Sequence, residues 1–245
     1  MESFNRVAEE YLHYNRVQEE IITTLLPWVE GRVLDLGAGP VPLCRRKRLK
    51  FYLGIDSAPQ MAQLNPCPIL VANFDQLPLT PLIQTLKITQ IVSFSALHWS
   101  KNLPQIFTQI GKSGVDYLLA LFTATTFAEL HNFLGISSPL PSREKIEKWG
   151  KKTLPNLQIT PFNFKIEFSD GRTLLRYLKK SGVSTGATAP LSRLLQFGKK
   201  PPFLHLQLEV LVLYPSRPHR KIFPVTRNFQ WEIFPSFPPN SPSPF

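Results

Sequence analysis

Residues 33–42, V-L-D-L-G-A-G-P-V-P, restrict the possible folds of this chain more than any other segment. The apolar run that starts at Val33 predicts a buried strand, and Gly37 and Gly39 predict a tight turn directly after it. Glycines at such a turn let the backbone approach a ligand closely. The segment is therefore typical of the first strand and turn of a nucleotide-binding βαβ unit, although an ordinary strand-to-helix turn is also compatible with it.

The residues after the glycines restrict the choice of ligand. A dinucleotide site requires a third glycine and backbone N–H donors for a pyrophosphate, but Pro40 and Pro42 have no N–H. Asp35 adds a negative charge beside the turn. A ligand with an ammonium group gains from this carboxylate, and we therefore expect S-adenosylmethionine as the cofactor in preference to NAD.

A second acid supports a nucleotide site. Asp56 ends the apolar run 51–55, which predicts a second strand. An acid about 20 residues after the glycine turn is the usual acceptor for the ribose hydroxyls. We predict this role for Asp56.

Composition limits the class of protein. The 245 residues are 43% hydrophobic, and no apolar run reaches the roughly 20 residues of a membrane span. The first ten residues, MESFNRVAEE, do not resemble a secretion signal, so we expect a cytoplasmic protein. Cys44 and Cys67 form no metal-ligand pattern and are expected to be free thiols. The formal charge of +11 favours an acidic partner or a polyanion without choosing between them.

The order of patterns along the chain predicts an α/β fold with a mostly parallel sheet. Apolar residues at helical spacing over 4–26 predict an N-terminal helix within a lid, 1–30, and the residues 31–124 form the expected cofactor-binding core. Helical patterns return over 125–200, the expected cap or substrate region, and the segment 201–216 is the expected final, antiparallel strand. The tail, 217–245, is rich in proline and is expected to be disordered and dispensable for folding. The core strands are predicted at 32–36, 51–55, 68–72, 89–94 and 115–123.

Six stretches together resemble the class I S-adenosylmethionine-dependent methyltransferases, and more narrowly the malonyl-[acyl-carrier protein] O-methyltransferases of biotin synthesis. FNRVAEEYLHYNRVQ resembles the opening helix of that family, VLDLGAGP and GIDSAPQM its first two cofactor motifs, and ANFDQLPL the segment after its third strand. SFSALHW resembles its fourth strand end, and FSDGRTLLRYLKKSGVSTG resembles its cap. The chain has Val41 in place of a third glycine, Asn73 in place of an adenine-binding aspartate, Phe94 in place of an asparagine and His98 in place of a glutamine.

This resemblance implies a Rossmann-like methyltransferase sheet with an N-terminal helix and a helical cap insertion. It implies a carboxylate acceptor on acyl carrier protein, with no membrane and no nucleic acid as partner. Because the carboxylate is already ionised, methyl transfer requires no catalytic base and no metal. The expected cofactor-binding residues are Asp35, Gly37, Gly39, Asp56, Ser57, Met61, Asn73 and Asp75. The substrate-binding candidates are Tyr11, Ser93, His98, Trp99, Arg143 and Arg176. Two alternatives stay open: a methyltransferase of another small acid or of nucleic acid, and a methyltransferase-like binding or assembly factor without activity.

Overall fold

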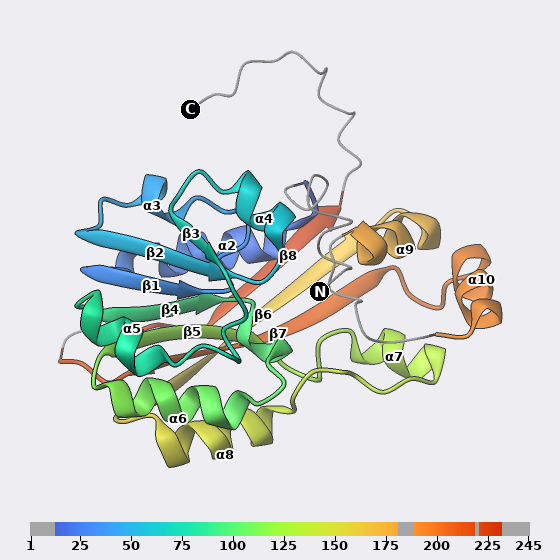
Figure 1. The fold of residues 1–245 in the computed structure, drawn as a ribbon. Helices are drawn as coiled ribbons and strands as arrows, with labels where there is room; N and C mark the ends of the chain where they lie inside the picture. The colour runs from blue at the N-terminus through green and yellow to red at the C-terminus, as the bar shows by residue number, and fades with distance from the viewer. Residues whose placement is uncertain (1–12, 181–188, 219–220, 232–245) are drawn as a thin grey trace.

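A computed structural model describes residues 13–180, 189–218 and 221–231 (Figure 1). Its centre is an eight-stranded sheet in the order β3-β2-β1-β4-β5-β7-β6-β8. The strands are β1 (Arg32–Leu36), β2 (Phe51–Asp56), β3 (Ile69–Val71), β4 (Gln90–Phe94), β5 (Asp116–Phe122), β6 (Leu157–Phe168), β7 (His205–Pro215) and β8 (Val225–Trp231). The first five agree with the strands predicted from the sequence to within one residue at each end.

The helices lie between and beside these strands. They are α2 (Arg16–Leu25), α3 (Leu43–Arg46), α4 (Pro59–Leu64), α5 (Leu79–Thr85), α6 (Leu103–Ser113), α7 (Ala128–Leu134), α8 (Arg143–Thr153), α9 (Gly171–Lys180) and α10 (Leu191–Lys199). Two short 3-10 turns, η1 (Leu26–Trp28) and η2 (Leu97–Trp99), follow α2 and β4. None of the helices in the described ranges is long and apolar enough to cross a membrane.

The strand directions explain where a ligand can bind. β1, β2, β3, β4 and β5 pair in parallel, so their carboxyl ends meet at one edge of the sheet. The strand order reverses between β1 and β4, and ligands of open α/β sheets bind at such a point. β7 pairs antiparallel with both β5 and β6, as predicted for the segment 201–216.

Two apolar layers cover the sheet. On one face, α5, α6 and α8 pack against side chains such as Leu34 and Leu119. On the other face, α2 and the helices α7, α9 and α10 pack against side chains such as Val33 and Phe162. The region 125–200, which the sequence predicts as a cap, is divided in the structure. The helices α7, α9 and α10 lie together beside the sheet in Figure 1, whereas the segment between α8 and α9 forms β6 within the sheet.

Local sequence signals set several helix ends. Asn102 accepts a hydrogen bond from the N–H of Gln105 at the start of α6, and Gly114 ends that helix in the left-handed conformation, with φ 69°. Asp170 accepts hydrogen bonds from the N–H groups of Arg172 and Thr173 at the start of α9. These caps satisfy backbone groups that the helices leave unpaired.

The prediction of a disordered tail is wrong for residues 225–231. These residues form β8, which pairs in parallel with β6 from Phe162↔Val225 to Phe168↔Trp231. Trp231 stacks on Tyr14 with ring centroids 5.2 Å apart and contacts Tyr177 edge-on. Strand pairing and aromatic packing together fix this part of the tail on the domain, whereas 232–245 lie outside the described residues.

The prediction of free cysteines is also wrong, because Cys44 and Cys67 form a disulfide. Cys44 lies in α3, and Cys67 lies between α4 and β3, with 5.9 Å between the two Cα atoms. This Cα separation is within the range that a disulfide spans without strain. The parallel arrangement of β1, β2 and β3 brings the two cysteines together across 23 residues of sequence.

Candidate active site

A cavity of about 510 Å³ lies at the carboxyl ends of β1, β2 and β4. It lies where the strand order reverses, so the fold places a ligand site there. All eight residues predicted to bind the cofactor line this one cavity: Asp35, Gly37, Gly39, Asp56, Ser57, Met61, Asn73 and Asp75.

The glycine turn forms the floor of the cavity. Gly37 has φ 77°, and its N–H donates to the carbonyl of Ile55 at 2.7 Å. A Cβ atom at this position would lie 2.1 Å from the Cβ of Ala96, so the close approach of the two loops requires glycine. Gly39 has φ 56° and would place a Cβ in open space, which leaves its backbone accessible from the cavity.

Asp56 connects the turn to the end of β2. Its Oδ2 accepts the N–H of Gly39 at 2.8 Å, and its Oδ1 accepts the N–H of Ala58 at 2.8 Å. Burial raises the pKa of this carboxyl, while the two backbone N–H groups act in the opposite direction. Each carboxylate oxygen has further acceptor capacity, so both can accept ribose hydroxyls as well.

Asp35 is the most deeply buried acid of the site. It is 4% exposed, and its Oδ2 accepts the hydroxyl of Tyr52 at 2.9 Å. Burial raises the pKa of Asp35 to about 7, and the nearby charge of Asp56 acts in the same direction. A positive ligand group beside this carboxylate would favour its ionised form and would itself be stabilised.

The loops after β3 and β4 form the opposite wall. Asn73 Oδ1 accepts the N–H of Asp75, which fixes a turn. Asp75 then accepts the hydroxyl of Ser100 at 2.5 Å and the N–H of Lys101 at 2.9 Å. These bonds join the loop after β3, which holds Asn73 and Asp75, to the loop that follows η2.

His98 and Trp99, both substrate-binding candidates, lie on η2 and line the cavity. His98 is 5% exposed, and its Nδ1 accepts the N–H of Phe122 at 3.4 Å. Burial lowers the pKa of His98 to about 3, so the imidazole is neutral at physiological pH. With Nδ1 as the acceptor, Nε2 carries the proton and can serve as a hydrogen-bond donor.

Among the other substrate-binding candidates, Ser93, Arg143 and Arg176 do not line the cavity. Ser93 is fully buried, and its hydroxyl donates to the carbonyl of Leu36 at 2.6 Å, so it joins β4 to β1. Arg176 is exposed on α9. Tyr11 lies outside the described residues.

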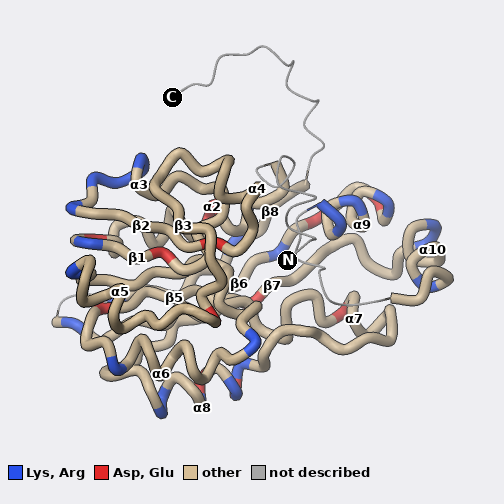
Figure 2. Tube along the Cα trace, viewed as in Figure 1, with Lys and Arg blue, Asp and Glu red and all other residues tan. Residues whose placement is uncertain are grey.

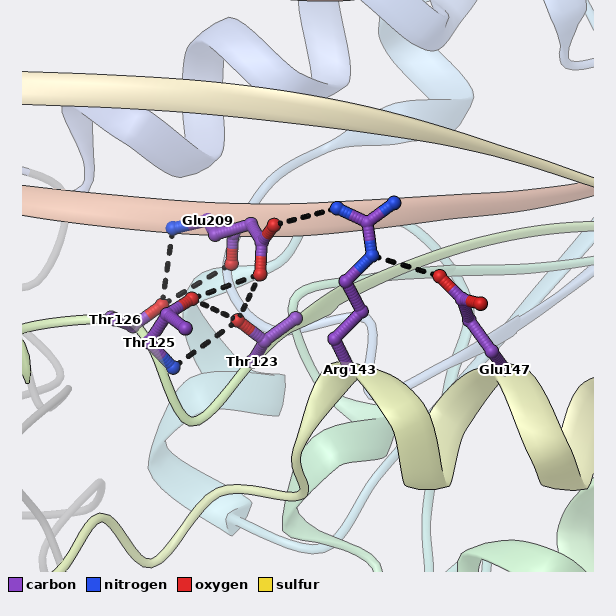
Figure 3. Close-up of polar contacts among 6 residues, drawn as sticks. All are labelled: Thr123, Thr125, Thr126, Arg143, Glu147 and Glu209. Atoms are coloured by element: carbon purple, nitrogen blue, oxygen red, sulfur yellow. Dashed lines mark hydrogen bonds and ion pairs between the residues drawn. The ribbon is translucent and has the colours of Figure 1, made fainter.

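Arg143 has a different role from the one expected (Figure 3). Its Nε donates to Glu147 at 2.8 Å, and a terminal nitrogen donates to Glu209 at 3.1 Å. The other carboxylate oxygen of Glu209 accepts the hydroxyls of Thr123 and Thr125 at 2.7 and 2.9 Å. Arg143 therefore fastens α8 to β7 and to the loop after β5, and it is already paired with two carboxylates.

Two polar atoms in the cavity wall were not predicted from the sequence. Gln18 Oε1 and Ser95 Oγ are buried and have no hydrogen-bond partner among the described residues. Gln18 lies on α2, and Ser95 follows β4 with φ 66°, a conformation that costs energy for a residue other than glycine. Unpaired buried polar atoms are rare in native structures, and their presence in a cavity wall points to a bound ligand.

Further wall residues complete the cavity. They include Ile22 on α2, Phe74, Phe94 and Pro139, which are apolar, and Lys101, which is exposed at the rim. Helical periodicity predicted an N-terminal helix over 4–26 but could not show that Ile22 would border this cavity. No group of acidic, histidine or cysteine side chains within the described ranges could hold a metal ion.

Comparisons with known proteins agree with this description of the fold. No protein-family model matches the sequence, and no curated protein is significantly similar to it. Among solved structures, the chain is similar to one chain of a complex between the Haloferax volcanii Trm112 methyltransferase activator and a protein classed as a methyltransferase. The two are 15% identical with a TM-score of 0.52, and the match covers 89% of this chain and 99% of the other.

Two further solved structures show the same fold. An S-adenosylmethionine-dependent methyltransferase from Thermotoga maritima is 11% identical, with a TM-score of 0.51 over 88% of this chain and 99% of the other. An Anabaena variabilis protein classed as a methyltransferase from an antibiotic biosynthesis pathway is 16% identical, with a TM-score of 0.52 over 82% and 97%. At these identities the comparisons establish the fold alone.

The fold is therefore the Rossmann-like fold of class I methyltransferases, with a mixed eight-stranded sheet and helices on both faces. Within this fold, the chain places the predicted cofactor residues around a single cavity at the reversal of strand order.

Proposed function

We propose that this protein binds S-adenosylmethionine and transfers its methyl group. The proposal rests on one observation: Asp35, the glycine turn and Asp56 all line the same cavity of about 510 Å³. A dinucleotide would place its pyrophosphate at the turn, but Pro40 and Pro42 offer it no N–H donor. The buried carboxylate of Asp35 is better suited to the positively charged groups of S-adenosylmethionine.

Each part of the wall has a task in this proposal. Asp56 accepts the ribose hydroxyls, Asn73 and Asp75 border the adenine, and Asp35 stabilises positive charge at the methionine end. Neutral His98 and the apolar ring of Trp99 exclude water and orient the acceptor beside the cofactor. Such orientation can lower a barrier by roughly 7–11 kcal/mol. An acceptor that is already ionised requires no general base.

The more specific proposal is that the acceptor is the free carboxylate of a malonyl group on acyl carrier protein. Two observations support it besides the sequence resemblance. Arg172, Arg176 and Lys179 form an exposed basic stripe along α9, and α10 ends in Lys199 and Lys200 (Figure 2). An acidic carrier protein would be attracted to this surface.

A carboxylate acceptor also needs a cation in the cavity. Arg143 is occupied by Glu147 and Glu209, and Arg176 lies outside the cavity wall. Lys101 is the cation that the described wall offers, at the rim of the cavity. We therefore propose that Lys101, in place of the sequence-based candidates Arg143 and Arg176, contacts the substrate carboxylate.

Calorimetric titration tests the cofactor. S-adenosylhomocysteine should bind, and NAD should not. Replacement of Asp56 by Ala should weaken the affinity for S-adenosylhomocysteine roughly 10- to 150-fold, because each charge-assisted hydrogen bond contributes about 1.5–3 kcal/mol. Replacement of the exposed Glu144 on α8 by Ala is the matched control and should change nothing. Failure of the unaltered protein to bind S-adenosylhomocysteine would refute the proposal.

Methylation assays test the acceptor. The catalytic efficiency with malonyl-[acyl-carrier protein] should fall with added salt more than that with malonyl-CoA, because salt screens surface attraction over a Debye length of about 8 Å. Lys101→Met should lower activity with both substrates. Cofactor binding without methylation of either substrate would favour another small acid, a nucleic acid or a binding factor without activity.

A further inference from the structure

The Cys44–Cys67 disulfide closes the wall of the cofactor cavity. Cys44 directly follows Leu43, which lines the cavity and is 2% exposed. Cys67 is 6% exposed and follows α4, whose Met61 also lines the cavity. The disulfide therefore joins two segments that border the same ligand space.

Asn65 connects the disulfide to the glycine turn. Its side-chain amide donates to the carbonyl of Gly39 at 2.8 Å and to the carbonyl of Val41 at 3.1 Å. Its Oδ1 accepts the N–H of Cys67 at 3.0 Å. Gly39 in turn donates to Asp56, so a chain of bonds leads from the disulfide to the predicted ribose acceptor.

The two cysteine residues differ in burial. Cys67 is buried, whereas Cys44 is half-buried and is followed by Arg45, Arg46, Lys47 and Arg48. Positive charges favour a thiolate over a thiol, so these basic residues stabilise the Cys44 thiolate that reduction releases. Arg45 and Arg48 are exposed, and no described residue forms an ion pair with them.

We propose that Cys44–Cys67 is a thiol–disulfide exchange site for a dithiol reductant, and that its reduction weakens cofactor binding. The inference rests on the proposed cofactor. With the disulfide closed, the segments 39–44 and 65–67 are held together and the cavity wall is fixed. With the disulfide open, the segments 39–44 and 65–67 lose their covalent connection and are joined by the hydrogen bonds of Asn65 and by apolar packing, so more of the wall must be ordered when the ligand binds.

Reduction of the disulfide by a dithiol proceeds in two exchange steps. A thiolate of the dithiol attacks the sulfur of Cys44, the S–S bond breaks, and Cys67 leaves as a thiolate that takes a proton from water. The second thiol of the reductant loses its proton and displaces Cys44, which leaves as a thiolate. The dithiol is oxidised by two electrons to a disulfide, and the protein is reduced to two thiols.

Calorimetry with S-adenosylhomocysteine tests the inference on the oxidised protein and on protein reduced with dithiothreitol, with released thiols counted from maleimide mass shifts. Reduction should weaken the affinity about 5- to 150-fold, the usual range of coupling between sites. By the same linkage, saturating S-adenosylhomocysteine should lower the fraction of protein reduced at a fixed dithiothreitol ratio. The double variant Cys44→Ser, Cys67→Ser should bind as the reduced protein does and should not respond to dithiothreitol.

A second variant covers the case in which reduction unfolds the protein. Asn65→Ala removes the connecting hydrogen bonds while the disulfide stays closed, and it should also weaken binding. Asn132→Ala, at an exposed position of α7, is the matched control. Equal affinity of the folded oxidised and reduced proteins, with two thiols counted in the latter, would overturn the inference, as would unchanged affinity in Asn65→Ala. Absence of binding by every form would instead overturn the proposed cofactor, and this inference with it.

Discussion

Replacement of Asp35 by Asn should make the ligand-free protein more stable at neutral and alkaline pH. Burial raises the pKa of Asp35 from 3.8 to about 7. One pKa unit corresponds to about 1.4 kcal/mol, so ionised Asp35 costs about 4 kcal/mol of folding free energy above pH 7. Asparagine has nearly the same shape, can accept the hydroxyl of Tyr52 and carries no charge.

The sign of the pH dependence follows from the raised pKa. Between pH 3.8 and about 7, the folded protein binds the Asp35 proton and the unfolded chain has released it. The contribution of Asp35 to stability is therefore fully present below pH 3.8 and is lost as the pH rises through 7. The stability gain of Asp35→Asn should be near zero at pH 4 and about 4 kcal/mol at pH 8, by the same linkage.

Urea unfolding followed by circular dichroism at pH 4, 6 and 8 measures this gain. A second measurement is the affinity for S-adenosylhomocysteine at pH 8, which should fall in the variant because it lacks the carboxylate that we propose as the partner of the ligand's ammonium group. A variant less stable than the unaltered protein at pH 8, or a stability difference that is the same at pH 4 and pH 8, would refute the reasoning.

Three further predictions concern folding and the cavity. Truncation after Arg217 removes β8 and its aromatic contacts, and it should lower the Tm by roughly 6–12 °C, the shift that about 3 kcal/mol produces in a chain of this size; an unchanged Tm would mean that β8 adds no stability. Gly37→Ala forces a Cβ against Ala96 at a φ that costs about 1–2 kcal/mol, and calorimetry should show weaker binding of S-adenosylhomocysteine. Arg143→Ala should destabilise the protein by about 1 kcal/mol in urea unfolding, because the pair with Glu209 is partly exposed, and should leave cofactor affinity unchanged. A loss of affinity in that variant would instead place Arg143 in the site.

The parts of the fold that local patterns determine could be predicted. The apolar runs at 32–36 and 89–94 are buried strands, and the glycine turn lies between β1 and α3 as its residue types require. The location of the predicted cofactor residues follows from the same logic, since parallel strands bring their carboxyl ends to one edge. Asp35 and Asp56 therefore meet at one cavity although 20 residues separate them.

The parts that depend on long-range contacts could not be predicted. Proline, serine and phenylalanine dominate the composition after residue 217, and they concealed the strand β8, in which Val225, Phe229 and Trp231 are the partly buried positions. The disulfide depends on the parallel pairing of β1 with β2 and of β2 with β3. The spacing of the two cysteines in the sequence gives no information about this pairing. Glu147 lies four residues from Arg143 on the same helix, but the second acidic partner, Glu209, comes close to Arg143 only because β7 lies beside α8.

The position of β8 has a consequence for the synthesis of this protein. Arg16 on α2 bonds to the carbonyl of Gln230, which lies 214 residues later, and Arg227 pairs with Glu20 on the same helix. α2 also supplies Gln18 and Ile22 to the cavity wall. While the chain emerges from the ribosome, the helix that borders the cavity is made early but must wait for one of the last described strands to hold it. Contacts over such separations slow folding, so these polar links between α2 and β8 can form only after the core strands that pack on the apolar face of α2 have been synthesised.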